Sequence, residues 1–236
     1  MSSSPSERGP APRVVLVHGI RDDARSFDEA RRHLTDLDVV AYHRRGWAPG
    51  SIERPTELAA HVEDLVTLLG ERPSVVIGHS WGGNVALAAA TERPDLVTAV
   101  GVYETAMFWM EGWPEGHRDL VDGTMDKVGA RPDGTPRQVQ HRALFVIEAG
   151  MTRYPTFELD RPRPPCTVAH GSASGEFFRA GMRRAAELLG AELVVIEGAG
   201  HMAHREDPEG FARFVRTVVA TAAPTAAADR NGRSDT

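Results

Sequence analysis

The sequence predicts an α/β fold, with a mostly parallel central sheet of about six strands and helices on both of its faces. Short runs rich in β-branched residues alternate with longer amphipathic runs along most of the chain, which is typical of such a sheet. One short run ends in a serine between two glycines and leads directly into an alanine-rich run. The length of 236 residues suits one domain of this kind.

The expected elements follow one another in β-α order. The short β-branched runs predict strands, because strands of four to eight residues bounded by turn residues have this composition. These strands are residues 13–17, 38–43, 74–77, 96–103, 166–170 and 191–196. The longer runs between and after them predict helices at residues 23–35, 56–69, 83–91, 175–189 and 208–220. Together they predict one α/β domain over residues 13–220.

Residues 105–165 interrupt this alternation, since they carry no clear strand. A structureless loop of that length is unusual in a compact domain, so we expect a helical lid insertion over the carboxyl ends of the strands. Aromatic residues of the insertion favour a pocket for an apolar acyl group or ring. The alternative is that they only dock the insertion on the core. The candidate pocket residues are His18, Phe108, Trp109, Trp113 and Met202.

Composition narrows the class of protein. Lys and Arg number 27 against 33 Asp and Glu, so the net charge of −6 offers no surplus of cations and disfavours nucleic-acid binding. The single cysteine, Cys166, excludes an intramolecular disulfide and a cysteine-cluster zinc site. We expect no metal and no organic cofactor. Oligomeric state is left open by the sequence.

The two ends of the chain differ from the rest. Residues 1–12 are rich in Ser, Pro and Gly, and residues 221–236 turn from Ala, Pro and Thr to polar and charged residues, so we expect both to be disordered. Neither a secretory signal nor an apolar run of membrane-spanning length is found. These features favour a cytoplasmic protein with no membrane partner.

Ser80 is the candidate nucleophile. A serine that attacks a carbonyl carbon has to be presented on a sharp strand-to-helix turn, which leaves almost no room for side chains two residues to either side. Gly78 and Gly82 occupy those two positions, after a β-branched strand and before an alanine-rich helix. The alternative is that Ser80 only caps the helix.

His201 is the candidate base. A neutral serine is a poor nucleophile and requires a base that is oriented by a third group. After the last expected strand, residues 197–204 read Glu-Gly-Ala-Gly-His-Met-Ala-His, where the glycines let the loop curve back over the sheet and present a histidine. His204 is the alternative base, although we favour the interpretation that it is a histidine on a surface loop.

These motifs resemble those of the α/β-hydrolase superfamily, and the resemblance covers nearly everything between residues 13 and 220. Residues 14–20, Val-Val-Leu-Val-His-Gly-Ile, resemble the first core strand of that family and its His-Gly turn. The resemblance implies that the backbone N–H groups of Ile20 and Trp81 form an oxyanion hole and that His18 shapes its loop. It also implies the chain order serine, acid, histidine.

The acid departs from the common pattern of this family. Its members usually place the acid in a His-Gly-Asp-x-Asp segment after the lid, but residues 170–176 read His-Gly-Ser-Ala-Ser-Gly-Glu. Another position used in the superfamily is the end of the strand after the nucleophile helix, where this chain has Glu104. A Tyr-Glu there, with Gly-x-x-Ser before Phe177 and Phe178, is similar to a subgroup of small bacterial α/β-hydrolases. Glu104 is therefore the candidate acid. Glu176 is the alternative acid, and if it has that role, Glu104 would instead anchor the lid.

The resemblance implies a serine hydrolase that acts on a small, partly apolar ester, lactone or thioester through an acyl-enzyme intermediate. Ser80 would attack, His201 would transfer the proton and Glu104 would orient His201. Two alternatives stay open. The same fold serves carbon-carbon hydrolases, lyases and haloperoxidase-like enzymes, and it also occurs in ligand-binding proteins without turnover.

Overall fold

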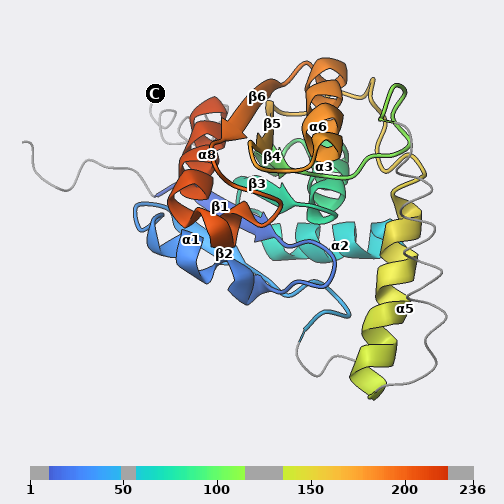
Figure 1. Ribbon diagram of the computed structural model, residues 1–236. Coiled ribbons are helices and arrows are strands. Elements are labelled where there is room, and N and C mark those ends of the chain that lie inside the picture. Colours follow the sequence, from blue (N-terminus) through green and yellow to red (C-terminus); the bar gives the residue numbers. More distant parts are fainter. Residues whose placement is uncertain (1–10, 49–56, 115–134, 223–236) are drawn as a thin grey trace, which may run out of the picture.

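The computed structural model describes residues 11–48, 57–114 and 135–222. In these residues six parallel strands form one sheet in the order β2-β1-β3-β4-β5-β6 (Figure 1). Strands that are neighbours in the sheet but not in the sequence require crossover connections, which the helices provide. The strands are β1 (Arg13–Val17), β2 (Asp38–Ala41), β3 (Ser74–His79), β4 (Val97–Tyr103), β5 (Cys166–Gly171) and β6 (Glu192–Ile196).

The helices cover both faces of the sheet (Figure 1). Side chains of α2, α3 and α6 pack in one apolar cluster, and those of α1 and α8 pack in another on the opposite face. The helical segments are η2 (Ala24–Phe27), α1 (Asp28–Arg32), α2 (Leu58–Leu69), α3 (Gly82–Glu92), α5 (Pro136–Met151), α6 (Glu176–Leu189), α7 (Ala203–Glu206) and α8 (Pro208–Thr221). None of the helices in the described residues is both long and apolar enough to cross a membrane.

Alternation along the strands explains the two clusters. Val14 and Leu16 of β1 belong to the cluster under α1 and α8, whereas Val15 and Val17 belong to the cluster under α2, α3 and α6. Successive side chains of a strand point to opposite faces, so a continuous run of apolar residues supplies both cores. The predicted fold class is confirmed. One expected helix, residues 23–35, is divided into η2 and α1.

The long insertion between β4 and β5 carries one helix in its described part, α5. Thr135 begins this helix with a capping box, in which its side chain accepts from the backbone N–H of Gln138 and the Gln138 side chain accepts from the N–H of Thr135. Figure 1 shows α5 beside α2. The expected lid is described only in part, because residues 115–134 lie outside the described residues. The expected tails also lie largely outside them.

Candidate active site

Ser80 lies on the sharp turn between β3 and α3. Its φ of 52° falls in the left-handed region, which residues other than glycine seldom adopt. The turn is closely packed: a Cβ on Gly78 would collide with the Cα of Gly83, and a Cβ on Gly82 would collide with the Val17 carbonyl oxygen. The two glycines are therefore required by close approach of the backbone.

The side chain of Ser80 does not cap the helix. The cap residue of α3 is Trp81, and it makes no side-chain hydrogen bond to the first turn. The backbone N–H of Ser80 donates to the Tyr103 carbonyl oxygen at 2.8 Å, which fixes the turn against the end of β4. The half-buried Ser80 side chain makes no hydrogen bond with the described residues.

His201 contacts the acid that the sequence singles out. Its Nδ1 atom lies 2.8 Å from Oε2 of Glu104. A carboxylate only accepts hydrogen bonds, so Nδ1 carries the hydrogen, and in the neutral form of the ring the lone pair is on Nε2. The Glu104 side chain is fully buried, whereas the His201 side chain is 34% exposed. The ring therefore reaches from a buried partner to the surface of the site.

Glu104 directly follows β4 and has a φ of 46°, so the strand stops before it and the side chain turns towards β5. Its Oε1 accepts from the backbone N–H of Gly171 at 2.9 Å and from the hydroxyl of Ser174. Ser174 stands at one of the two positions where the family usually has aspartate. That serine therefore supports a carboxylate that comes from another strand.

Glu176, the alternative acid, faces solvent on the first turn of α6. Its carboxylate pairs with Arg179 at 2.8 Å and with Arg183 at 2.5 Å. The hydrogen bond from Arg183 lowers the pKa of Glu176 below its ordinary value. The structure thus brings Glu104, and not Glu176, to His201.

Hydrogen bonds to Ser172, Tyr103 and His79 help to fasten the loop that carries His201. The backbone N–H of Gly198 donates to Oγ of Ser172 at 2.8 Å, and the Tyr103 hydroxyl donates to the Gly200 carbonyl oxygen at 2.6 Å. Nε2 of His79 lies 2.8 Å from the His201 carbonyl oxygen. Burial holds the pKa of His79 well below its ordinary value, so its ring is neutral and Nε2 carries the donor hydrogen. The residue just before Ser80 thereby fixes the backbone of His201.

The expectation that His204 is a surface histidine is wrong. Its ring is fully buried, with centroids 4.8 Å from Phe27 and 4.5 Å from His79. Nε2 lies 3.3 Å from Oδ2 of Asp22. Glycines of the loop suggested exposure, but α7 begins at Ala203 and turns the next residue inward. His204 is a buried partner of Asp22 and lies behind the site.

Asp22, His79 and His204 also have ligand-type atoms within 4.8 Å of one another, and they are the one such group in the described residues. Arg205 lies 2.7 Å from Oδ1 of Asp22, so a guanidinium already neutralises this carboxylate. The Nε2 atom of His79 is used by the His201 carbonyl. Arg205 and the His201 carbonyl therefore compete with any cation for two of these three side chains.

The turn after β1 lies directly against Ser80. A Cβ on Gly19 would approach the Cβ of Ser80 to 2.8 Å. The next residue along this turn is Ile20. The backbone N–H groups of Ile20 and Trp81 have no acceptor among the described residues. Two unpaired backbone donors thus flank the serine.

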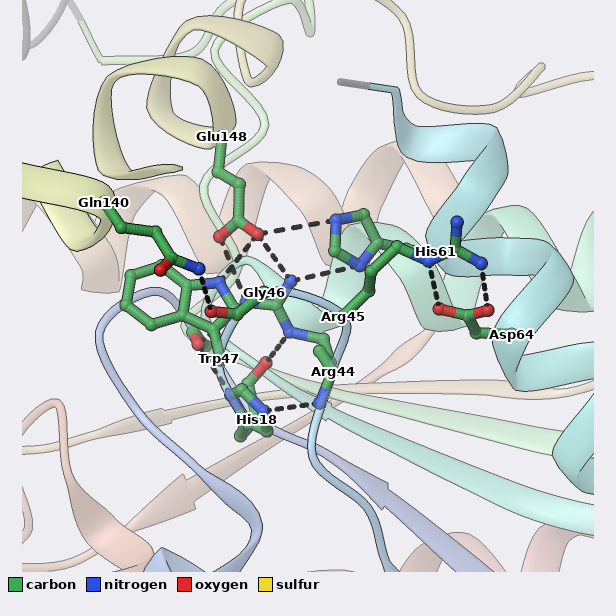
Figure 2. A network of polar contacts seen from close by, with 10 residues as sticks. His18, Arg44, Arg45, Gly46, Trp47, His61, Asp64, Gln140 and Glu148 are labelled. Carbon is green, nitrogen blue, oxygen red and sulfur yellow. Dashed lines mark hydrogen bonds and ion pairs between the residues drawn. The ribbon is translucent and has the colours of Figure 1, made fainter. Parts of the chain in front are cut away.

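A buried network holds this turn from behind (Figure 2). Arg44 is fully buried, and its guanidinium donates from Nε to the His18 carbonyl oxygen at 2.8 Å and from Nη2 to the Gly19 carbonyl oxygen at 2.9 Å. It also forms a two-pronged ion pair with Glu148 of α5, at 2.8 and 3.1 Å. Trp47 donates to the same carboxylate at 2.9 Å. Sequence reasoning missed Arg44 and Glu148.

Two histidines belong to this network. The Nε2 atom of His18 accepts from the backbone N–H of Arg44 at 3.0 Å, so Nδ1 carries the hydrogen and donates to the Gly19 carbonyl oxygen at 2.9 Å. Burial, reinforced by the Arg44 cation, lowers the pKa of His18 to about 3 and that of His61 to about 2. Both rings are therefore neutral, and the His18 ring shapes the turn.

Comparison with known proteins identifies the family. Residues 14–214 match the profile described as the alpha/beta hydrolase family. The chain belongs to the α/β-hydrolase family. It is 35% identical over 102 residues to lipase LipV of Mycobacterium tuberculosis, an alignment that spans 42% of this chain and 39% of LipV.

Two further relatives align over most of their length. A pimeloyl-[acyl-carrier protein] methyl ester esterase of Neisseria meningitidis is 26% identical over 246 residues, which is 88% of this chain and 92% of the esterase. The crystal structure of NosK from Streptomyces actuosus superposes with a TM-score of 0.69 and 23% identity, covering 90% of this chain and 99% of NosK. The NosK likeness shows the fold alone.

Aromatic side chains of this α/β-hydrolase lead from the insertion to His201. Phe108 and Trp113 are buried and contact Phe177, with ring centroids 5.7 and 5.9 Å apart. Phe178 stacks on His201 at 4.4 Å with an interplanar angle of 19°. Trp109 is half-buried against Phe157, and Met202 is half-buried beside His201. Phe178 was quoted for the resemblance but not expected at the site.

Proposed function

We propose that this α/β-hydrolase is a serine hydrolase that cleaves a small ester, lactone or thioester through an acyl-enzyme intermediate. The observation that carries the proposal is the 2.8 Å contact between Nδ1 of His201 and Oε2 of Glu104, on a loop fastened to the residue before Ser80. Along the chain the nucleophile Ser80 comes first, the acid Glu104 second and the base His201 third, which is the order of the family. The proposal gives no role to a metal or an organic cofactor.

In the first half of the reaction Ser80 attacks the carbonyl carbon of the substrate while Nε2 of His201 takes the hydroxyl proton. Glu104 keeps Nδ1 protonated and stabilises the imidazolium that forms. In this structure the Ser80 hydroxyl and Nε2 of His201 are not hydrogen-bonded. Such bonds are often long in ligand-free enzymes and tighten in the complex.

The negative charge that develops on the carbonyl oxygen requires preorganised donors. We assign this role to the backbone N–H groups of Ile20 and Trp81, which flank Ser80 and have no acceptor among the described residues. The imidazolium of His201 then protonates the leaving alcohol or thiol. In the second half water attacks the acyl-enzyme with His201 as base, and the acid product leaves.

The substrate class rests on two kinds of support. Two relatives carry names of ester-cleaving enzymes, a lipase and a methyl ester esterase. The aromatic side chains that join the insertion to His201 favour a partly apolar substrate, because large apolar side chains line most small-molecule pockets. Phe108, Trp109, Trp113 and Met202 remain pocket candidates in this proposal.

A panel of substrates tests the proposed reaction. We expect the wild-type chain to hydrolyse p-nitrophenyl acetate, p-nitrophenyl butyrate and a matching thioester. Ser80→Ala should hydrolyse none of these substrates, while its circular-dichroism spectrum stays the same as that of the wild type. Substrates for carbon-carbon hydrolysis form the comparison set. Turnover of that set with no ester or thioester cleavage would overturn the assignment, as would equal turnover by Ser80→Ala.

A further inference from the structure

We propose that Arg44 is a positioning residue for the oxyanion hole and that Glu148, on the inserted helix α5, holds Arg44 in place. The inference rests on the proposed function, because it concerns the backbone N–H groups that we assign to the oxyanion. It adds a route by which a residue of the insertion controls turnover without touching the substrate.

The argument begins with the peptide between Gly19 and Ile20. The carbonyl oxygen of Gly19 and the N–H of Ile20 belong to the same planar peptide unit, and the described residues contain no cis peptide bond. In a trans peptide the N–H points opposite to the C=O. Whatever fixes the Gly19 oxygen therefore fixes the direction in which the Ile20 N–H points.

Two donors fix that oxygen. Nη2 of Arg44 lies 2.9 Å from it, and Nδ1 of His18 also lies 2.9 Å from it. One of these donors carries a full positive charge, and hydrogen bonds to a carbonyl oxygen polarise the peptide. The N–H of Ile20 is thereby aimed and made a stronger donor. A neutral His18 ring is needed for this pattern, since its Nε2 atom accepts from the backbone of Arg44.

The same guanidinium contacts the second proposed donor residue. Cζ of Arg44 lies 4.6 Å from the centroid of the Trp81 ring, a cation-π contact with the residue that follows Ser80. Nε of Arg44 binds the His18 carbonyl oxygen at 2.8 Å. One buried side chain therefore touches both segments that supply the oxyanion donors.

Glu148 supplies the charge that lets Arg44 stay buried. Both side chains are fully inaccessible to solvent, and the carboxylate meets the guanidinium through both of its oxygens (Figure 2). A buried cation without a partner is strongly unfavourable. Trp47 and His61 also face the carboxylate, at 2.9 and 3.5 Å. Displacement of α5 would remove this partner, so the seating of the insertion is coupled to the geometry of the turn.

The first test compares two neighbouring arginines of one turn. Arg44→Lys keeps the charge, but an ammonium cannot reproduce the planar fork that reaches two carbonyls and a carboxylate at once. Arg45→Lys is the matched control, because Arg45 pairs with Asp64 at 2.5 to 2.9 Å instead of with the Gly19 carbonyl. We expect kcat for p-nitrophenyl butyrate to fall at least about tenfold in Arg44→Lys with KM little changed, and to stay within about twofold in Arg45→Lys.

A transition-state analogue separates positioning from general damage. Affinity of Arg44→Lys for a trifluoromethyl ketone, which forms an oxyanion with Ser80, should fall by the same factor as kcat/KM. A kcat within twofold of wild type, or an undiminished analogue affinity, would overturn the inference. If the wild type shows no Ser80-dependent hydrolysis, the proposed function and this inference both fall; an active wild type with an unaffected Arg44→Lys removes only the inference.

A double-mutant cycle tests the part played by Glu148. Glu148→Gln should lower kcat several-fold with KM little changed, and it should cause no further loss in the Arg44→Lys background, because it acts through Arg44. Equal losses in both backgrounds would overturn the coupling. If Arg44→Lys fails to fold, Glu148→Gln decides alone: an unchanged kcat overturns the inference, and a lower kcat with unchanged KM and equally reduced analogue affinity supports it.

Discussion

Nδ1 of His201 lies 2.8 Å from Oε2 of Glu104, although 97 positions separate the two residues in the sequence. Glu104 follows β4 and His201 follows β6, and only β5 lies between these strands in the sheet. Parallel strands bring their carboxyl ends to one edge, which is where ligands bind in open α/β sheets. The contact therefore forms where Ser80 also emerges from β3.

The proposed orienting acid, Glu104, gives the first prediction. Glu104→Gln should lower kcat at least about a hundredfold with KM little changed, because an amide can no longer stabilise the imidazolium of His201. Glu176→Gln is the matched control, since this carboxylate pairs only with arginines on the surface of α6 in the described contacts. Steady-state kinetics of both variants decide. A silent Glu104→Gln would refute the assignment of the acid.

Ser174 gives a second, smaller prediction. Its hydroxyl donates to Oε1 of Glu104, so Ser174→Ala removes one of the donors that hold this buried carboxylate. We expect kcat to fall about threefold to tenfold, the effect of one hydrogen bond of ordinary strength. Kinetics should be measured together with the melting temperature. An unchanged kcat in a normally folded variant would show that the hydroxyl does not help to place the acid.

The two loop histidines should separate activity from stability. His201→Ala should abolish ester hydrolysis and leave the unfolding free energy nearly unchanged. His204→Ala should keep most activity but cost about 2–5 kcal/mol of stability, because it empties a buried site against Phe27 and removes a partner of Asp22. Urea unfolding and kinetics on both variants test this. The reverse pattern would exchange their roles.

Buried neutral histidines give a prediction on pH. Burial, together with the Arg44 cation, holds the pKa of His61 at about 2 and that of His18 at about 3, below the ordinary value of 6.5. Between these values the unfolded chain binds more protons than the folded one. Above about pH 6.5 the two rings therefore cause no loss in the free energy of unfolding. As the pH falls below that value, the free energy of unfolding decreases by up to about 1.4 kcal/mol per pH unit for each histidine.

Urea unfolding at several pH values between 7.5 and 4.5 measures this slope. His61→Gln should flatten it, because one of the groups that gain a proton on unfolding is gone. Identical slopes for the wild type and His61→Gln would contradict the pH prediction.

Local sequence patterns predicted much of the fold and of the site. The β-branched run before Ser80 and the glycines at positions 78 and 82 predicted the turn. A nucleophile elbow requires small residues close to the serine in the sequence, so a local pattern is enough to indicate it. Serines stand at the usual aspartate positions, and the resemblance to family members with the acid after the strand that follows the nucleophile helix therefore pointed to Glu104. In the structure its carboxylate contacts His201. Residue type and chain order left Glu176 open as well, and the family resemblance decided between the two.

Partners that are distant in the sequence could not be predicted. Arg44 and Glu148 are 104 positions apart, and Glu148 lies in an insertion without a recognisable pattern. Nothing in either segment indicates that its charge is buried. For His204 the loop composition was misleading, because glycines next to a histidine do not show that a short helix turns the following residue inward.

The central claim is that Ser80 is a nucleophile activated by His201 and Glu104. Labelling by a fluorophosphonate, followed by peptide mass spectrometry, tests it most directly, since the reagent bonds covalently to an activated serine. The account predicts stoichiometric labelling of Ser80 in the wild type, almost none in His201→Ala, and labelling in Glu104→Gln slowed at least about a hundredfold. No adduct on wild-type Ser80, or an equal labelling rate in His201→Ala, would contradict it.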